Sequence, residues 1–107
     1  MPDIPPILEV YSVGPTTVVG FGGRDVLDDV NLVACREEIL ALIEREKCDT
    51  IAFDLTGVTL LPSGMLGLLA SMRQHGAEVH LYNPSDDVRD VLEVTNLKQL
   101  MPIHYTN

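Results

Sequence analysis

The chain has 107 residues, of which 46% are hydrophobic, and this length and composition suit one folded domain with its own core. Sixteen acidic and seven basic residues give a formal net charge of −9, which argues against nucleic acid or an anionic membrane surface as a direct partner. The start lacks the features of a signal peptide, and no window reaches the roughly 18 apolar residues of a membrane span. We therefore expect a cytoplasmic protein without membrane insertion, with one domain over residues 1–107 and any disordered N-terminus confined to residues 1–6.

The first third of the chain predicts two strands and a helix. Residues Leu8–Val13 and Thr16–Phe21 are rich in Val, Thr and aromatic residues, and Gly14-Pro15 separates them as a turn. A loop with several glycines and aspartates follows. From Val30 to Lys47 apolar residues recur at helical spacing, with charged residues between them, which predicts an amphipathic helix.

Two cysteines lie on this predicted helix and at its end. Cys35 shares the apolar stripe with Leu32 and Ile39, so we expect it to be a small core residue. Cys48 is thirteen positions further on, which corresponds to about 20 Å along a helix and exceeds the reach of a disulfide. A redox role would need a partner cysteine from another molecule, and we expect a structural role instead.

The remaining elements alternate between strand and helix. Ser85 can cap the last helix, and Gly76 suits the left-handed position that ends the helix before it. This alternation predicts an α/β sandwich in which helices pack on a mixed sheet of four to five strands. The predicted elements are strand Thr50–Leu55, helix Ser63–His75, strand Glu78–Tyr82, a helix from Pro84-Ser85 to Thr95-Asn96, a turn at Leu97–Met101 and a short strand at Ile103–Tyr105.

No catalytic or metal-binding constellation is visible in the sequence. The acidic loop Asp25–Asp29 lacks EF-hand spacing, and Gly20–Gly23 lacks the remaining residues of a phosphate or dinucleotide loop. The histidines are dispersed, and none stands at ligand spacing from a second ligand: His75, His80 and His104. We therefore expect no enzyme activity, no metal and no cofactor, and the pattern favours a binding module.

Three segments, in order along the chain, carry a resemblance to one family. Gly22-Gly23-Arg24-Asp25 resembles a G-E-L-D loop that follows the second strand. Asp54–Gly67 resembles D-L-S-G-V-x-F-I-D-S-S-G-L-G without a gap. Asn83–Leu97 resembles N-P-S-x-x-V-x-x-V-L-E-x-T-G-L. The chain thus resembles a STAS domain of the bacterial anti-sigma factor antagonists, which implies a STAS-like sandwich.

The resemblance also implies a regulatory function. In that family a serine at the start of the second helix is phosphorylated by a partner that is both a serine kinase and an anti-sigma factor. The unmodified form binds this partner and the phosphorylated form releases it. Ser63 falls on the phosphoacceptor position, and the Gly22–Asp29 loop is expected at the same end of the molecule. The expected partner-binding residues are Asp25, Pro62, Ser63, Gly64, Met65 and Leu66, whereas Leu68, Leu69 and Met72 are expected to be buried.

The sequence departs from the family pattern around Ser63 and leaves alternatives open. Pro62 replaces an aspartate, and Gly64 and Met65 replace a Ser/Thr and a glycine. Ser63 could then be only a helix N-cap, a role worth about 1 kcal/mol. The alternative function is a phosphorylation-independent STAS scaffold in a signalling or membrane-associated assembly, and an enzyme or small-ligand domain ranks third. We expect a monomer, with a weak homodimer as the alternative.

Overall fold

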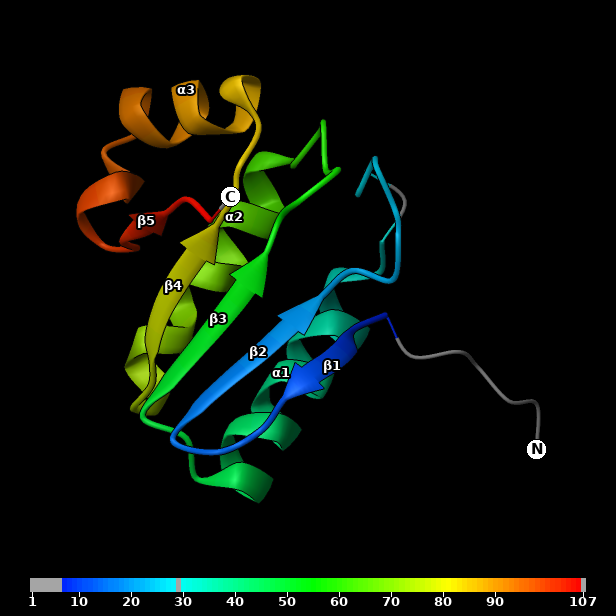
Figure 1. Ribbon diagram of the computed structural model, residues 1–107, viewed down its shortest axis with the longest axis vertical. Coiled ribbons are helices and arrows are strands. Elements are labelled where there is room, and N and C mark those ends of the chain that lie inside the picture. The colour runs from blue at the N-terminus through cyan, green and yellow to red at the C-terminus, as the bar shows by residue number, and fades with distance from the viewer. Residues whose placement is uncertain (1–6, 29, 107) are drawn as a thin grey trace.

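A five-stranded mixed sheet organises the computed structural model, which describes residues 7–28 and 30–106. The strands lie in chain order across the sheet, with β1 antiparallel to β2 and the other neighbours parallel (Figure 1). This arrangement confirms the predicted mixed sheet of four to five strands. Residues 1–6, where we expected any disorder, lie outside the described residues. The strands are β1 Glu9–Ser12, β2 Thr16–Gly20, β3 Thr50–Asp54, β4 Glu78–Tyr82 and β5 Ile103–His104.

Two helices cover one face of this sheet. Helices α1 (Leu32–Glu46) and α2 (Ser63–Ser71) lie behind the strands in Figure 1, and the 3-10 helix η1 (Met72–His75) continues α2. Helix α3 (Asp86–Val94) and the 3-10 turn η2 (Leu97–Gln99) lie toward the end at which the parallel strands finish (Figure 1). No helix in residues 7–28 and 30–106 is long and apolar enough to cross a membrane.

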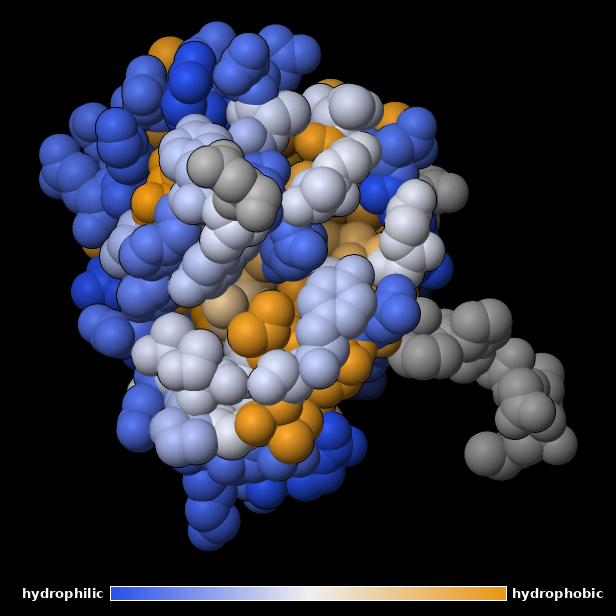
Figure 2. Space-filling view, viewed as in Figure 1, coloured by the Kyte–Doolittle hydropathy of each residue, from blue (hydrophilic) through white to orange (hydrophobic). Residues whose placement is uncertain are grey.

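The core lies between the sheet and these helices. Successive side chains of a strand point to opposite faces, so alternate residues of β3 and β4 meet the helices. The inward-facing residues of β3 and β4 and those of α1 and α2 are fully buried against one another: Ile51, Phe53, Val79 and Leu81 from the strands, and Cys35, Ile39, Met65 and Leu69 from the helices. No helix of the described residues covers the opposite face of the sheet, and Figure 2 shows apolar and weakly polar side chains at its centre with hydrophilic ones around them.

The helix ends agree closely with the sequence signals, with two differences. Helix α1 begins two residues later than predicted, because Asn31 caps it by accepting the N–H of Ala34 at 3.0 Å. The predicted helix from Ser63 to His75 changes from an α-helix to a 3-10 helix at Met72. Gly76 ends it in the left-handed region, with φ of 88°, as expected.

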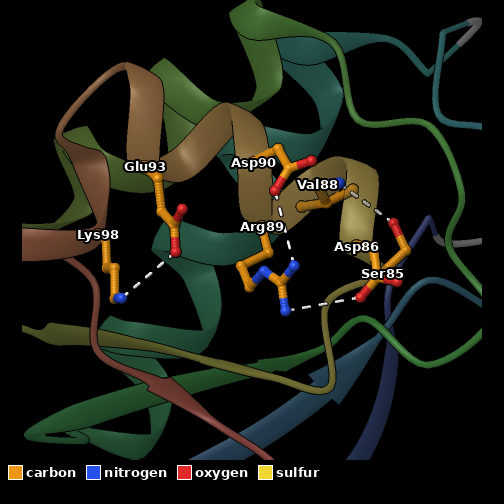
Figure 3. Close-up of polar contacts among 7 residues, drawn as sticks. All are labelled: Ser85, Asp86, Val88, Arg89, Asp90, Glu93 and Lys98. Atoms are coloured by element: carbon orange, nitrogen blue, oxygen red, sulfur yellow. Dashed lines mark hydrogen bonds and ion pairs between the residues drawn. The ribbon is translucent and has the colours of Figure 1, made fainter.

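Helix α3 begins with the serine cap that the sequence predicted. The Ser85 hydroxyl accepts the N–H of Val88 at 3.2 Å. Arg89 lies 3.6 Å from Asp86 and 3.7 Å from Asp90, and Figure 3 shows both ion pairs. Exposed pairs of this kind contribute up to about 1 kcal/mol each, so the cap and the buried face, rather than these ion pairs, hold α3 in place.

Both cysteines are free and buried, which confirms the core role expected for Cys35. Burial, together with the smaller effect of the neighbouring Glu38 carboxylate, raises the pKa of the Cys35 thiol to about 11. A thiol that stays protonated at neutral pH is a poor nucleophile. Cys35 therefore behaves as a small apolar residue that fills space between α1 and the sheet.

Candidate functional site

Ser63 is the exposed first residue of α2, at the helix end to which β3 leads. Pro62 is the N-cap, in an extended conformation and without a side-chain cap hydrogen bond. Its carbonyl accepts the N–H groups of Met65 at 3.0 Å and Leu66 at 3.1 Å. The interpretation of Ser63 as an N-cap is therefore wrong, because proline occupies the cap and Ser63 lies one residue inside the helix.

The position of Ser63 has an electrostatic consequence. The first N–H groups of a helix have no carbonyl partner within the helix, and they carry the positive end of its macrodipole. A negative charge near Ser63 is therefore favoured by the helix itself. Among the described residues, no histidine or carboxylate is hydrogen-bonded to the Ser63 hydroxyl.

The loop that contains Asp25 pairs with the loop that precedes Ser63. The Asp25 carbonyl accepts the N–H of Thr59 at 2.7 Å and that of Leu60 at 3.3 Å. Val26 forms a parallel bridge with Leu60, and the Leu60 carbonyl accepts the N–H of Leu27 at 3.2 Å. The described part of the predicted loop, residues 22–28, thus lies at the same end of the molecule as Ser63, while residue 29 lies outside the described residues.

Met65 and Leu66 are placed differently from the sequence-based expectation. Their exposed fractions are 0% and 1%, so they cannot form an accessible contact patch in this fold. Both lie on the helical face shared with Leu69 and Met72, at spacings of three, four and seven residues, and that face packs into the core. The expectation that Leu69 and Met72 are buried is confirmed, and Leu68 is half-buried.

The exposed apolar side chains beside Ser63 come from other elements. Leu60, in the loop before α2, is 48% exposed, and Leu32, in the first turn of α1, is 39% exposed. A Cβ atom added to Gly64 would lie 3.0 Å from Cδ1 of Leu32, which places the Leu32 side chain directly against Gly64. We call this region the Ser63 surface, and it consists of Asp25, Leu32, Leu60, Pro62, Ser63 and Gly64.

Sequence reasoning missed Leu32 and Leu60 for different reasons. Leu32 continues the apolar stripe of α1, but it lies in the first turn, where the helix extends past the part of the core that would cover it. Leu60 and Leu61 are adjacent in an extended segment, and Leu61 is only 6% exposed. Successive side chains of such a segment point in opposite directions, so the pair itself is a signal that one leucine faces solvent.

Arg24 is not part of the Ser63 surface. Its Nη1 atom donates to the carbonyl oxygens of Ile7 and Phe21, both at 3.0 Å. The Glu38 carboxylate on α1 accepts the N–H groups of Ile7 and Leu8, also at 3.0 Å each. These two side chains hold the segment before β1 against the rest of the domain. Arg24, which stands where the G-E-L-D pattern has leucine, therefore has a structural role.

Polar side chains also gather away from the Ser63 surface, at the cavity beside β1 and at the end of the sheet near β5. Within residues 7–28 and 30–106, no three His, Cys, Asp or Glu side chains are grouped so as to hold a metal ion. A cavity of about 540 Å³ between β1 and α1 is lined by Glu38, whose carboxylate already accepts two backbone N–H groups. The histidines were expected to be dispersed, but β4 and β5 bring His80 and His104 into contact at 2.8 Å.

Known proteins resemble this chain in sequence pattern and in fold. The model of the STAS domain family matches residues 9–107. The anti-sigma factor antagonist SpoIIAA in its unphosphorylated form has a TM-score of 0.72 at 22% identity, covering 90% of this chain and 86% of that one. A STAS domain protein from Planctomyces limnophilus has a TM-score of 0.74 at 20% identity, with 94% and 91% covered.

The phosphorylated form of Bacillus SpoIIAA is also similar, with a TM-score of 0.62 at 22% identity and with 90% and 89% of the two chains covered. Comparison with curated protein sequences gives no significant match. The identities to the solved structures are low, so these structures establish the fold, while the family match extends over nearly the whole sequence. The chain belongs to the STAS domain family.

Proposed function

We propose that this protein is a non-enzymatic antagonist of an anti-sigma factor, and that phosphorylation of Ser63 by that same partner, a serine kinase, switches it off. The observation that carries the proposal is the exposed Ser63 hydroxyl at the positive end of α2, beside the exposed leucines Leu32 and Leu60. The proposal includes a single domain over residues 1–107, acting as a cytoplasmic monomer. Solved structures of the similar protein SpoIIAA in unphosphorylated and phosphorylated forms support the idea of two states.

The switch follows from the charge of a phosphate. Phosphoserine carries a charge of about −1.5 to −2, and the N-terminus of α2 stabilises such a charge, so the fold is retained. In the complex, the partner covers Leu32 and Leu60 and removes water from around Ser63. A dianion buried there without a cation is costly, and a penalty of about 3 kcal/mol weakens binding more than a hundredfold.

Pro62 affects how the kinase must act. The family's aspartate could orient the serine hydroxyl, whereas proline offers no hydrogen-bonding side chain and holds an extended conformation, with φ of −63° and ψ of 151°. The kinase therefore has to supply the base that accepts the serine proton. The proline in turn presents Ser63 on a rigid backbone, which favours recognition by docking on the Ser63 surface.

The experiment is a phosphorylation assay with the anti-sigma factor kinases of the same organism and ATP. Mass spectrometry should find one added phosphate on the wild type and on Ser12→Ala, a control at an exposed serine in β1. The Ser63→Ala variant should remain unmodified. Phosphate on Ser63→Ala, or none on the wild type with every such kinase, would contradict the proposal.

A phosphorylation-independent scaffold is the second candidate function, and the replacement of the family's aspartate by Pro62 favours it. The two functions differ in one binding measurement. A scaffold binds its partner equally well as wild type, Ser63→Ala and Ser63→Asp, whereas a phosphorylation switch loses binding with Ser63→Asp alone. Isothermal titration calorimetry with the anti-sigma factor kinase as the partner measures this difference directly.

A further inference from the structure

A small hollow lies at the carboxyl ends of β3 and β4, on the sheet face that Figure 2 shows. Asp54 and Tyr82 are register neighbours on these strands, and each directly follows a core residue, so their side chains point to this face. The volume of about 270 Å³ is below the roughly 300 Å³ of the smallest pockets for drug-sized ligands, so the hollow suits a small group. Its lining consists of Val18, Asp54, Tyr82, Asn83 and Thr106.

One wall of the hollow is the flat face of the Tyr82 ring. This ring stacks on His104, with centroids 4.8 Å apart and planes 27° apart. His104 is the neighbour of Tyr82 on β5, and Asp54 is its neighbour on β3. Because His104 covers one face of the phenol ring, the other face is turned toward Asp54 and the hollow. The face of an aromatic ring carries negative charge density and attracts cations.

The Asp54 carboxylate supplies a full negative charge beside that ring. Its Oδ1 atom accepts the N–H of Thr56 at 3.0 Å and the Thr56 hydroxyl at 2.6 Å, and these two bonds fix the side chain. Within the described residues, its Oδ2 atom has no hydrogen-bond partner. A carboxylate held in place with one free oxygen can pair with a bound cation.

Carboxylates and phenols, rather than basic side chains, surround the hollow. The described strands contain no lysine or arginine, and besides Asp54 they carry the carboxylates of Glu9 and Glu78. The Tyr11 phenol lies against Gly20, the neighbour of Asp54 on β2, because a Cβ atom added there would overlap it. Partial burial and then the Glu9 and Asp54 carboxylates raise the pKa of the Tyr11 hydroxyl, which agrees with this placement. The surroundings therefore favour a cation over an anion.

We propose that the hollow binds a small organic ammonium ion between the face of Tyr82 and the carboxylate of Asp54. Val18 offers an apolar surface to the methyl groups of such an ion. Asn83 and Thr106 form a fixed rim, since the Asn83 amide donates to the Thr106 hydroxyl at 2.9 Å and accepts the Thr106 N–H at 2.8 Å. Aromatic faces are the usual recognition element for quaternary ammonium groups. This inference does not depend on phosphorylation of Ser63.

Titration with choline, followed through amide chemical shifts in NMR spectra, tests the proposal. The amides of Asp54, Tyr82 and Asn83 should shift and saturate with a Kd of about 1 mM, an affinity that suits a ligand this small. The control ligand is 3,3-dimethylbutan-1-ol, in which a carbon atom replaces the ammonium nitrogen. It should bind about tenfold more weakly, because it lacks the charge. The absence of saturable shifts with choline, or equal affinity for the alcohol, would overturn the proposal.

A second ligand distinguishes two sources of the same chemistry. A peptide that contains trimethyl-lysine presents the quaternary ammonium group on a protein side chain. Tighter binding of this peptide than of choline would identify a modified protein as the source, and weaker binding would identify a free ammonium ion.

Substitution of the carboxylate separates the site from general attraction by the acidic protein. Asp54→Asn removes the charge but keeps an oxygen that accepts the Thr56 N–H, so the urea midpoint should stay close to the wild type. Choline binding should weaken about tenfold. Glu78→Gln removes the same charge at the other end of β4 and should change the affinity less than about twofold. Equal losses in both variants would contradict a site at Asp54.

A matched pair of substitutions tests the aromatic wall. Tyr82→Phe keeps the ring and should bind choline within about twofold of the wild type, whereas Tyr82→Leu removes the ring face and should bind about three- to tenfold more weakly. Urea denaturation of both variants shows whether the fold is retained. Equal choline affinity of two folded variants would contradict the role of the Tyr82 ring and, with it, the proposed site.

Discussion

At the scale of single residues, Leu60 is the sharpest test of the Ser63 surface. It is half-exposed and projects from the loop that positions Ser63, so a partner docked there would bury it. We expect Leu60→Asp to weaken partner binding at least tenfold, since it replaces buried apolar contact with a charge, while changing the free energy of unfolding by less than about 1 kcal/mol. Calorimetric titration and chemical denaturation measure the two quantities.

The matched control for Leu60 is Val94→Asp. Val94 is 84% exposed at the end of α3, and the substitution introduces the same charge outside the Ser63 surface. It should leave partner affinity within about twofold of the wild type, a difference of less than 0.5 kcal/mol. Equal losses in both variants would mean that the added negative charge, and not the location of Leu60, weakens binding, and the proposed surface would then be wrong.

Sequence patterns predicted the position of Ser63 in the fold, but not the direction in which its neighbours on α2 face. The sequence predicted that Ser63 begins a helix, because strand, loop and apolar helix follow one another along the chain. It did not predict that Met65 and Leu66 face the core, since α2 is apolar on more than one side and its rotation is set by packing against the sheet. The contact of Leu32 with Gly64 joins two helices, and no local pattern encodes it.

At the scale of elements, the two helix-start serines should differ in what they contribute to stability. Ser85 caps α3 through a hydrogen bond to Val88, whereas Ser63 makes no cap bond at α2. We expect Ser85→Ala to lower the free energy of unfolding by about 1 kcal/mol and Ser63→Ala to change it by less than about 0.5 kcal/mol. Urea denaturation measures both, and a loss of 1 kcal/mol or more in Ser63→Ala would restore the cap role and weaken the phosphoacceptor interpretation.

The elements themselves were the most predictable part of the fold. Strand β4 was predicted to the residue, because alternating apolar residues and flanking glycine and asparagine define both ends. The pairing of β4 with β5 was not predictable, since twenty residues, including α3 and η2, separate the two strands and the packing of these helices sets the register. The His80–His104 contact depends on that register, which explains why the two histidines look unrelated in the sequence.

At the scale of the whole molecule, the burial of Cys35 makes the free energy of unfolding depend on the protonation of this thiol. The folded protein raises the pKa of this thiol from 9.0 to about 11, chiefly because burial disfavours the thiolate. The unfolded chain therefore loses the proton at a lower pH than the folded protein does. The stabilising contribution is fully present below pH 9 and is lost between pH 9 and about 11.

We expect this linkage to cost about 2–3 kcal/mol of unfolding free energy by pH 11, since each unit of pKa difference corresponds to 1.36 kcal/mol. The Cys35→Ala variant removes the thiol and, apart from a constant loss due to the small cavity, should show a shallower decline with pH. Subtracting the two denaturation series cancels the tyrosines and lysines, which are the same in both. Parallel curves above pH 9 would show that Cys35 ionises as readily inside the fold as in the unfolded chain, and that the core around it admits water.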